Sequence, residues 1–164
     1  MNEQPSAPQA WNWRDPSQLL GAGFGLGMLP AAPGTWASLV ALPAAWLIAG
    51  AAGRVGLALA ALAVFVVGVW AAGACIRKLD DQDPSRVVID EIAGQWLTLL
   101  AVEPGLLHYA VGFILFRAFD ILKPWPVGWA DRRVKGGLGV MLDDALAAAY
   151  AGVILYAIAR WMGT

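Results

Sequence analysis

The chain has 164 residues, of which 59% are hydrophobic and only 14% are charged, whereas a soluble domain carries about 25% charged residues. Its formal net charge is −1, and it contains a single cysteine. The composition and charge argue against a disordered chain and a nucleic-acid-binding protein, and they favour a small integral membrane protein. The single cysteine rules out an internal disulfide framework and a cysteine-based zinc cluster.

The first 18 residues are polar and contain three prolines, so we expect a loose N-terminal tail followed by a single membrane-embedded domain over residues 19–164. That domain contains five uncharged, largely apolar runs, at residues 36–53, 55–76, 92–102, 106–116 and 145–159. The run over residues 55–76 would make a helix of about 33 Å, which is long enough to cross a hydrocarbon core of about 30 Å. We therefore predict an all-α, polytopic membrane bundle of about five helices with polar cytoplasmic loops.

The segment Glu103-Pro104-Gly105 separates the third and fourth runs and predicts a tight turn between two helices. Each of these two runs has 11 residues, too few to span a bilayer unless flanking residues extend the helix. A hairpin that crosses the membrane and a re-entrant hairpin that does not both fit this pattern.

Basic residues are distributed unevenly over the predicted topology. With the N-terminus inside and five crossings, nine Lys and Arg residues fall on inner segments, and only Arg54 and Arg160 fall at outer ends. Because cytoplasmic loops carry an excess of Lys and Arg, we expect the polar loops to face the cytoplasm. The carboxylates beyond the tail fall on the same side, except Glu103.

Several of these carboxylates lie at the ends of the predicted helices. Asp90 and Glu91 precede the third run, Asp143 and Asp144 precede the last, and Asp120 follows the fourth. Acids at a helix N-terminus can be simple caps, but a cap needs one acid, and Asp120 lies at a C-terminal end. Ionisable groups at membrane depth are usually functional, and carboxylate oxygens are the ligands that Mg2+ prefers, so we predict a Mg2+ site.

Helical spacing constrains the roles of these acids. Adjacent residues on a helix point about 100° apart, which predicts that Asp90 and Glu91 do not aim at one point. One of them would then bind the metal ion while the other positions water or pairs with a base. Arg117 and Asp120 lie three residues apart on one helix face. A buried ion pair with no catalytic role explains this pair equally well.

Two glycine-containing loops are candidate phosphate sites. The first, residues 23–35, lacks the spacing of a dinucleotide fingerprint or a P-loop, but it would offer backbone N–H groups, with Thr35 as a helix N-cap facing a phosphate. A flexible loop in which Thr35 only caps the helix is the simpler alternative. The second, residues 132–139, combines three cations with three glycines and suits a phosphate or an anionic lipid surface.

Other functional classes fit the sequence less well. The single histidine, His108, falls on the outer side, away from the acids, which disfavours a Ser/His/Asp triad. Cys75 is interpreted as a buried thiol. A CDP-alcohol-type phosphotransferase would carry a DG…AR…G…D…D array, which is absent here. A non-enzymatic cation transporter or lipid-binding scaffold would place its acids near mid-membrane rather than at helix ends.

A string of motifs extends over residues 20–160. It comprises Gly23-Phe24-Gly25, Pro33-Gly34-Thr35-Trp36, Asp83, Val88, Asp90, Glu91, Gly94, the block FRAFDILKPWP at residues 116–126, Asp131-Arg132, Gly136-Gly137, Gly139, Met141 and Asp143-Asp144. This string resembles the phosphatidylglycerophosphatase A family of bacterial inner-membrane lipid phosphatases. Two residues depart from the family pattern: Leu26 stands where a small polar residue is common, and Ala148 replaces a glycine.

The resemblance implies an all-helical, Mg2+-dependent phosphoric monoester hydrolase that converts phosphatidylglycerophosphate to phosphatidylglycerol and phosphate in phospholipid biosynthesis. Metal ligation is expected from Asp83, Asp90, Glu91, Asp120, Asp131, Asp143 and Asp144. Catalytic roles are expected of Asp90, Glu91, Asp120, Asp143 and Asp144. Contacts with the substrate phosphate are expected from Thr35, Arg117, Lys123, Arg132, Gly136 and Gly137. A phosphatase acting on another lipid phosphate is the alternative within the same class.

Overall fold

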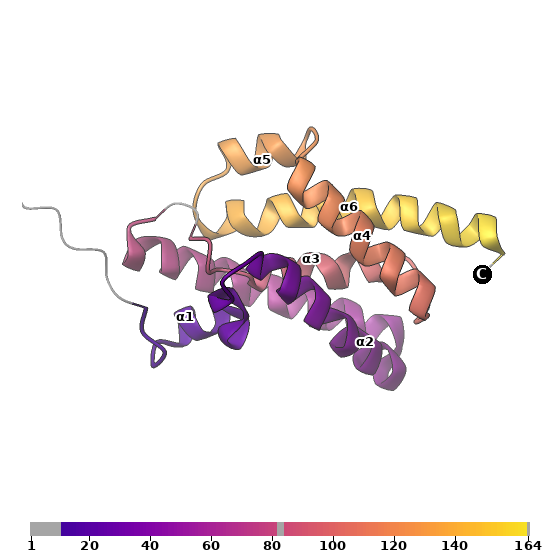
Figure 1. Cartoon of the computed structure of the whole chain (residues 1–164), viewed down its shortest axis with the longest axis horizontal. Helices are drawn as coiled ribbons and strands as arrows, with labels where there is room; N and C mark the ends of the chain where they lie inside the picture. Colours follow the sequence, from indigo (N-terminus) through magenta and orange to yellow (C-terminus); the bar gives the residue numbers. More distant parts are fainter. Residues whose placement is uncertain (1–10, 82–83, 164) are drawn as a thin grey trace, which may run out of the picture.

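The computed structural model describes residues 11–81 and 84–163, and every regular element in that part of the chain is a helix (Figure 1). The elements are α1 (Pro16–Gly21), the 3-10 helix η1 (Gly23–Met28), α2 (Pro33–Leu79), α3 (Ile89–Leu99), α4 (Leu106–Leu122), α5 (Val127–Arg133) and α6 (Gly136–Met162). The predicted all-α fold class is therefore confirmed.

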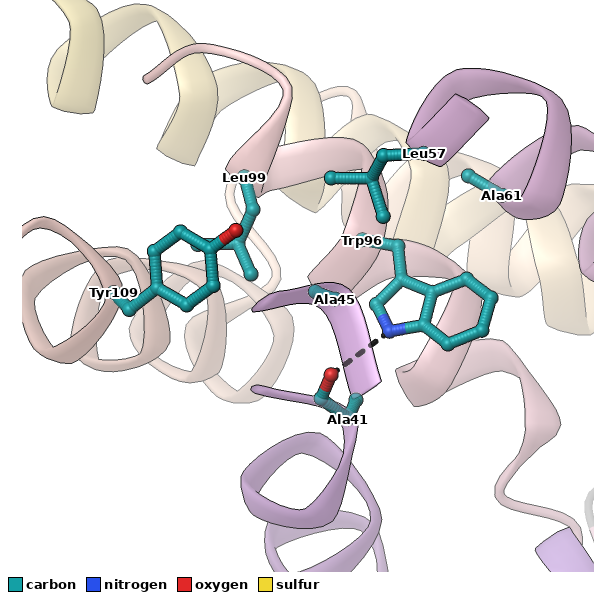
Figure 2. Close-up of a cluster of buried hydrophobic side chains, with 7 residues drawn as sticks. All are labelled: Ala41, Ala45, Leu57, Ala61, Trp96, Leu99 and Tyr109. Atoms are coloured by element: carbon teal, nitrogen blue, oxygen red, sulfur yellow. Dashed lines mark hydrogen bonds between the residues drawn. The ribbon is translucent and has the colours of Figure 1, made fainter. Parts of the chain in front are cut away.

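Helix α2 consists of two arms that fold back on each other. Gly53 has φ 66° and ψ −171°, a conformation that glycine adopts readily and other residues do not, and it breaks the helix. Ala41 and Ala45 of the first arm pack in one buried cluster with Leu57 and Ala61 of the second arm (Figures 1 and 2). The two arms, with α3, α4 and α6, correspond to the five apolar runs of the sequence.

Helix α3 lies at the centre of the bundle, where it contacts α2, α4 and α6 (Figure 1). Its Trp96 is 9% exposed, and the indole Nε1 donates a 2.9 Å hydrogen bond to the carbonyl oxygen of Ala41 (Figure 2). On another side of α3, a Cβ added to Gly94 would lie 2.6 Å from the ring of Phe116, so α3 and α4 approach closely only because residue 94 is glycine.

The turn between α3 and α4 covers residues 100–105, as Glu103-Pro104-Gly105 predicted. Glu103 there forms a 3.2 Å ion pair with Arg54, next to the break between the arms of α2. This exposed pair marks the end of α3 opposite to Asp90 and Glu91, which lie in its first turn.

The outer surface of the bundle is strongly apolar. Leu47, Val66 and Val153 are 72%, 60% and 72% exposed, on the first arm of α2, its second arm and α6. Within the described part of the chain, α2 and α6 are the helices whose length and composition would allow them to cross a membrane. Helix α3, at 11 residues or about 16 Å, is too short to do so by itself.

The predicted loose tail is wrong for its last residues. Helix α1 begins at Pro16, and the Asp15 side chain caps it by accepting a 3.0 Å hydrogen bond from the Ser17 backbone N–H. Lys78 donates a hydrogen bond to Asp15 and lowers the pKa of that carboxyl to about 2. Ser17 is buried against Cys75, whose thiol donates to the Ser17 carbonyl oxygen, as expected of a buried thiol.

Candidate active site

A cleft of about 610 Å3 opens where the N-terminal ends of α2, α3 and α6 meet the C-terminal end of α4 and helix α5. Its charged lining, among the described residues, consists of six carboxylates and four cations: Asp90, Glu91, Asp120, Asp131, Asp143, Asp144, Arg117, Lys123, Arg132 and Lys135. The carboxylates therefore outnumber the cations by two, which equals the charge of one divalent cation.

Three of the carboxylates form a cluster at the α3 side of the cleft. Asp90, Glu91 and Asp144 each place one carboxylate oxygen within 4.8 Å of the others. Asp90 Oδ1, Glu91 Oε2 and Asp144 Oδ2 are buried and accept no hydrogen bond. Buried carboxylates this close repel one another unless a cation lies between them, so the cluster fits a hard divalent ion such as Mg2+.

This cluster corrects one expectation from helical spacing. Asp90 and Glu91 were predicted not to aim at one point, but both contribute an oxygen to the same cluster. They lie in the first turn of α3, and the glutamate has one more methylene than the aspartate, which compensates for the angle between the two positions. Both residues can therefore contact one ion.

Two glycines bring the neighbouring helices against the cluster. A Cβ on Gly34, in the first turn of α2, would lie 1.8 Å from Glu91 Oε1. A Cβ on Gly94 would lie 3.3 Å from the Cβ of Asp144. One turn after Glu91 on α3, the Gln95 side chain is fully buried, and neither its amide nitrogen nor its amide oxygen has a hydrogen-bond partner. The cluster thus lies in a tightly packed, largely desolvated part of the bundle.

The other carboxylates of the cleft are paired with cations. Arg117 Nη1 lies 2.6 Å from Asp120 Oδ2 and 3.7 Å from Glu91 Oε1. The i,i+3 ion pair considered from the sequence is therefore present, and its arginine also faces the carboxylate cluster. Asp120 lies at the end of α4, where the helix dipole disfavours an acid, so the arginine offsets that cost.

Lys123 links α4 to α5 and α6. Its Nζ donates hydrogen bonds of 2.6 Å to Asp131 Oδ1 and 2.7 Å to Asp143 Oδ2. Burial alone would lower the pKa of Lys123, but the hydrogen bonds to the two carboxylates outweigh burial and raise it above its usual value. The lysine is therefore a fixed cation in the cleft at neutral pH.

Four of the six predicted phosphate contacts, Arg117, Lys123, Arg132 and Gly136, line the cleft, but Thr35 and Gly137 do not. The N-cap of α2 is Ala32, and the Thr35 N–H already donates to the Ala32 carbonyl oxygen at 2.9 Å. The prediction of Thr35 as N-cap is wrong because the helix begins at Pro33, a residue favoured in the first turn.

Gly137 has a packing role. A Cβ at this position would lie 2.0 Å from the carbonyl oxygen of Val69, so the glycine allows α6 to contact the second arm of α2. Lys135 also lines the cleft, although it was not among the predicted site residues. Its position in the basic segment 132–135 could have indicated this role. The predicted ligand Asp83 lies outside the described residues.

Clustered carboxylates able to hold a divalent cation, with lysine and arginine beside them in one cleft, are typical of metal-assisted phosphoester hydrolases. The exterior of the bundle adds a large exposed apolar surface beside that site. The fold and the cleft together are those expected of a helical hydrolase that acts on a lipid phosphate.

The comparisons with known proteins agree with this class. The sequence profile of phosphatidylglycerophosphatase A matches residues 19–159, and the chain belongs to that family. It is 37% identical over 145 residues to phosphatidylglycerophosphatase A of Escherichia coli (strain K12), covering 88% of this chain and 84% of that protein. It is 36% identical over 150 residues to phosphatidylglycerophosphatase A of Haemophilus influenzae, covering 90% and 91% of the two chains.

A third relative carries a different substrate in its name. A Bacteroides thetaiotaomicron protein, provisionally named a phosphatidylinositol-3-phosphatase, is 43% identical over 160 residues, covering 88% of this chain and 93% of that protein. No solved structure matches the chain. The two names carried by these three relatives, phosphatidylglycerophosphatase A and phosphatidylinositol-3-phosphatase, both describe phosphatases of phosphorylated lipids.

Proposed function

We propose that this chain is a Mg2+-dependent lipid phosphatase that hydrolyses phosphatidylglycerophosphate to phosphatidylglycerol and phosphate in phospholipid biosynthesis. Membership of the phosphatidylglycerophosphatase A family supports the substrate and the reaction. The observation that carries the mechanism is the cluster of three carboxylates, Asp90, Glu91 and Asp144, each with a buried oxygen that accepts no hydrogen bond, beside cations in one cleft.

Asp90, Glu91 and Asp144 would hold the Mg2+ ion, because each offers a buried oxygen without a hydrogen-bond partner. When bound, the ion would neutralise charge on the phosphate oxygens. It would also lower the pKa of a bound water molecule toward neutral. Asp120, Asp131 and Asp143, which were also predicted as ligands, are already paired with Arg117 or Lys123. We assign them to positioning those cations.

The cations of the cleft bind and orient the phosphate. Lys123 is held by Asp131 and Asp143, and Arg117 is held by Asp120 and lies near Glu91, so both offer positive charge at fixed positions without reorganisation during the reaction. Arg132 and Lys135 line the same cleft and add charge at its rim. A carboxylate of the cluster, Glu91 or Asp144, accepts the proton of the attacking water, as the predicted catalytic roles require.

We further propose that the bundle is a multi-pass protein of the bacterial inner membrane, with the cleft facing the cytoplasm. The apolar exterior and the two long apolar helices support embedding in the bilayer. The orientation rests on the excess of Lys and Arg in the segments that surround the cleft. The substrate phosphate would then reach the cleft without its acyl chains leaving the bilayer.

A substrate panel tests this proposal. Purified protein in detergent micelles containing Mg2+ is given phosphatidylglycerophosphate, phosphatidate or phosphatidylinositol-3-phosphate, and phosphate release is measured. We expect the highest kcat/KM on phosphatidylglycerophosphate. A higher value on phosphatidylinositol-3-phosphate would overturn the substrate, and Mg2+ binding without phosphate release from any of the three would favour a non-enzymatic lipid-binding protein.

A further inference from the structure

A second hollow, of about 650 Å3, lies between η1, both arms of α2 and α3. None of its lining residues is charged, in contrast to the acidic cleft. The volume falls in the range of about 300–1,000 Å3 that is usual for small-ligand sites. We call this hollow the apolar groove.

Small residues create the apolar groove. Ala41 and Ala44 of the first arm of α2, Ala63 of the second arm and Gly23 of η1 line it, while Ile92 and Trp96 of α3 present larger apolar side chains. Ala63 is exposed and Val67, one turn further along the same arm, is 38% exposed, so the groove opens at the outer surface of the bundle. A ligand could therefore enter from the side, out of a bilayer.

Phe24 lines the groove and combines an exposed side chain with an unusual backbone conformation. Its side chain is 74% exposed, and its backbone φ of 56° is unfavourable for any residue with a Cβ. Helix η1 packs closely against the residue before α3. A Cβ on Gly23 would lie only 3.2 Å from the Val88 side chain. A strained backbone that presents an uncovered phenyl ring fits a position that contacts an apolar ligand.

The groove and the acidic cleft share the same two helices. On α3, Asp90 and Glu91 line the cleft, whereas the next residue, Ile92, lines the groove. On the first arm of α2, Gly34 lines the cleft and Val40 lines the groove, six residues or about 9 Å further along the helix. A polar site and an apolar site at this spacing match the head group and the chain of one lipid.

We infer that the apolar groove binds an acyl chain of the lipid whose phosphate occupies the acidic cleft. This inference rests on the proposed lipid phosphatase function and adds to it a chain-binding site that anchors the substrate. Binding energy from the chain would place the phosphate beside Asp90, Glu91 and Asp144, so the groove should contribute to KM for lipid substrates alone.

The test compares one substrate with and without its chains. Wild type and Ala63→Trp are assayed on diacyl phosphatidylglycerophosphate in mixed micelles and on its deacylated, water-soluble counterpart. Because the indole would displace chain methylenes from the groove, we expect kcat/KM for the diacyl substrate to fall about tenfold relative to the deacylated one. The matched control is Ala149→Trp, which places the same side chain on an exposed position of α6 and should leave the ratio unchanged.

The outcomes separate the inference from the proposed function. An unchanged ratio in Ala63→Trp, or an equal loss on both substrates, would overturn the chain site while leaving the phosphatase intact. Hydrolysis of neither substrate by the wild type would instead overturn the function. A second measurement uses phosphatidylglycerol with a diazirine in mid-chain: we expect cross-links at residues 63–67 or 92–96, and cross-links confined to α4 and α6 would contradict the inference.

Discussion

The acidic cleft and the apolar groove have nearly equal volumes, about 610 and 650 Å3, but opposite chemistry. Ten charged residues line the cleft, while the groove has none. Both are bounded by α2 and α3, so the change of character occurs within a few residues along each helix. On α3, the groove residues Ile89 and Ile92 lie on either side of the cleft residues Asp90 and Glu91, so different faces of one helix separate head-group chemistry from chain binding.

The two hollows also have different structural origins. The cleft forms where helices end, and it is held by ion pairs such as Lys123 with Asp131 and Asp143. The groove forms along helix sides, where alanine and glycine leave space between packed elements. Substitutions in the cleft should therefore alter hydrolysis of every substrate, whereas substitutions near the groove should alter stability or chain recognition.

The largest effect is expected for Glu91→Gln. The substitution removes one carboxylate of the cluster formed with Asp90 and Asp144 while keeping the side-chain size, and kcat should fall on the order of 10^3-fold on diacyl and deacylated substrates alike. Mg2+ should also raise the melting temperature of the wild type more than that of the variant. Initial rates of phosphate release and thermal unfolding measure the two effects.

The matched control is Glu103→Gln, the same change in an exposed ion pair at the opposite end of α3. Its rate should stay within about twofold of wild type, because exposed ion pairs contribute little. Equal losses in the two variants would mean that the cluster has no special role.

A smaller loss is expected for Lys123→Met. Removing the cation leaves Asp131 and Asp143 without their lysine and removes a fixed positive charge, so kcat/KM should fall about 100-fold on both substrates. The wild-type lysine stays charged from about pH 6 to about pH 9, because the hydrogen bonds to Asp131 and Asp143 raise its pKa. Lys78→Met, which breaks an ion pair with Asp15 outside the cleft, should retain wild-type kcat/KM. A wild-type rate in Lys123→Met would exclude the lysine from phosphate binding.

Helix α3 separates the two hollows, and Gly94→Ala tests how tightly it is held. The new Cβ would meet the Phe116 ring at 2.6 Å, and overpacking of this kind costs about 1–3 kcal/mol of unfolding free energy. Gly50→Ala places the same methyl group in α2 with no atom within 4 Å, and it should be neutral or stabilising by up to about 1 kcal/mol. Denaturant unfolding in detergent compares them, and equal stabilities would show that the packing is loose.

The smallest effect is expected for Trp96→Phe beside the groove. The variant loses the hydrogen bond to the Ala41 carbonyl oxygen, which should cost about 1 kcal/mol of unfolding free energy (Figure 2). Its kcat on the deacylated substrate should remain unchanged, because Trp96 does not line the cleft. A large loss of kcat on that substrate would contradict the separation of the two hollows.

Much of this architecture could be predicted from the sequence, because charged residues in an apolar chain are confined to helix ends. The runs on either side of Arg54, the turn at Glu103 and the acids at residues 90, 91, 143 and 144 all follow from that rule. Which acids gather in one cluster and which bind Lys123 or Arg117 most closely could not be predicted, since this depends on which helices meet.

Other features escaped prediction for equally local reasons. Thr35 is a good N-cap residue, but Pro33 starts the helix earlier, and the side-chain cap is lost. Helix α1 is short and polar, and it is ordered by the contacts of Asp15 and Ser17 with Lys78 and Cys75 on α2. The apolar groove has no sequence motif, because small residues of η1 and of both arms of α2, which are distant in the sequence, create it.

The most direct test of the central claim is phosphate release from phosphatidylglycerophosphate by the purified protein, measured in EDTA and again after Mg2+ is restored. The carboxylate cluster of Asp90, Glu91 and Asp144 predicts loss of activity in EDTA and recovery with Mg2+. Full activity in EDTA would contradict a divalent cation at these carboxylates and the mechanism built on them.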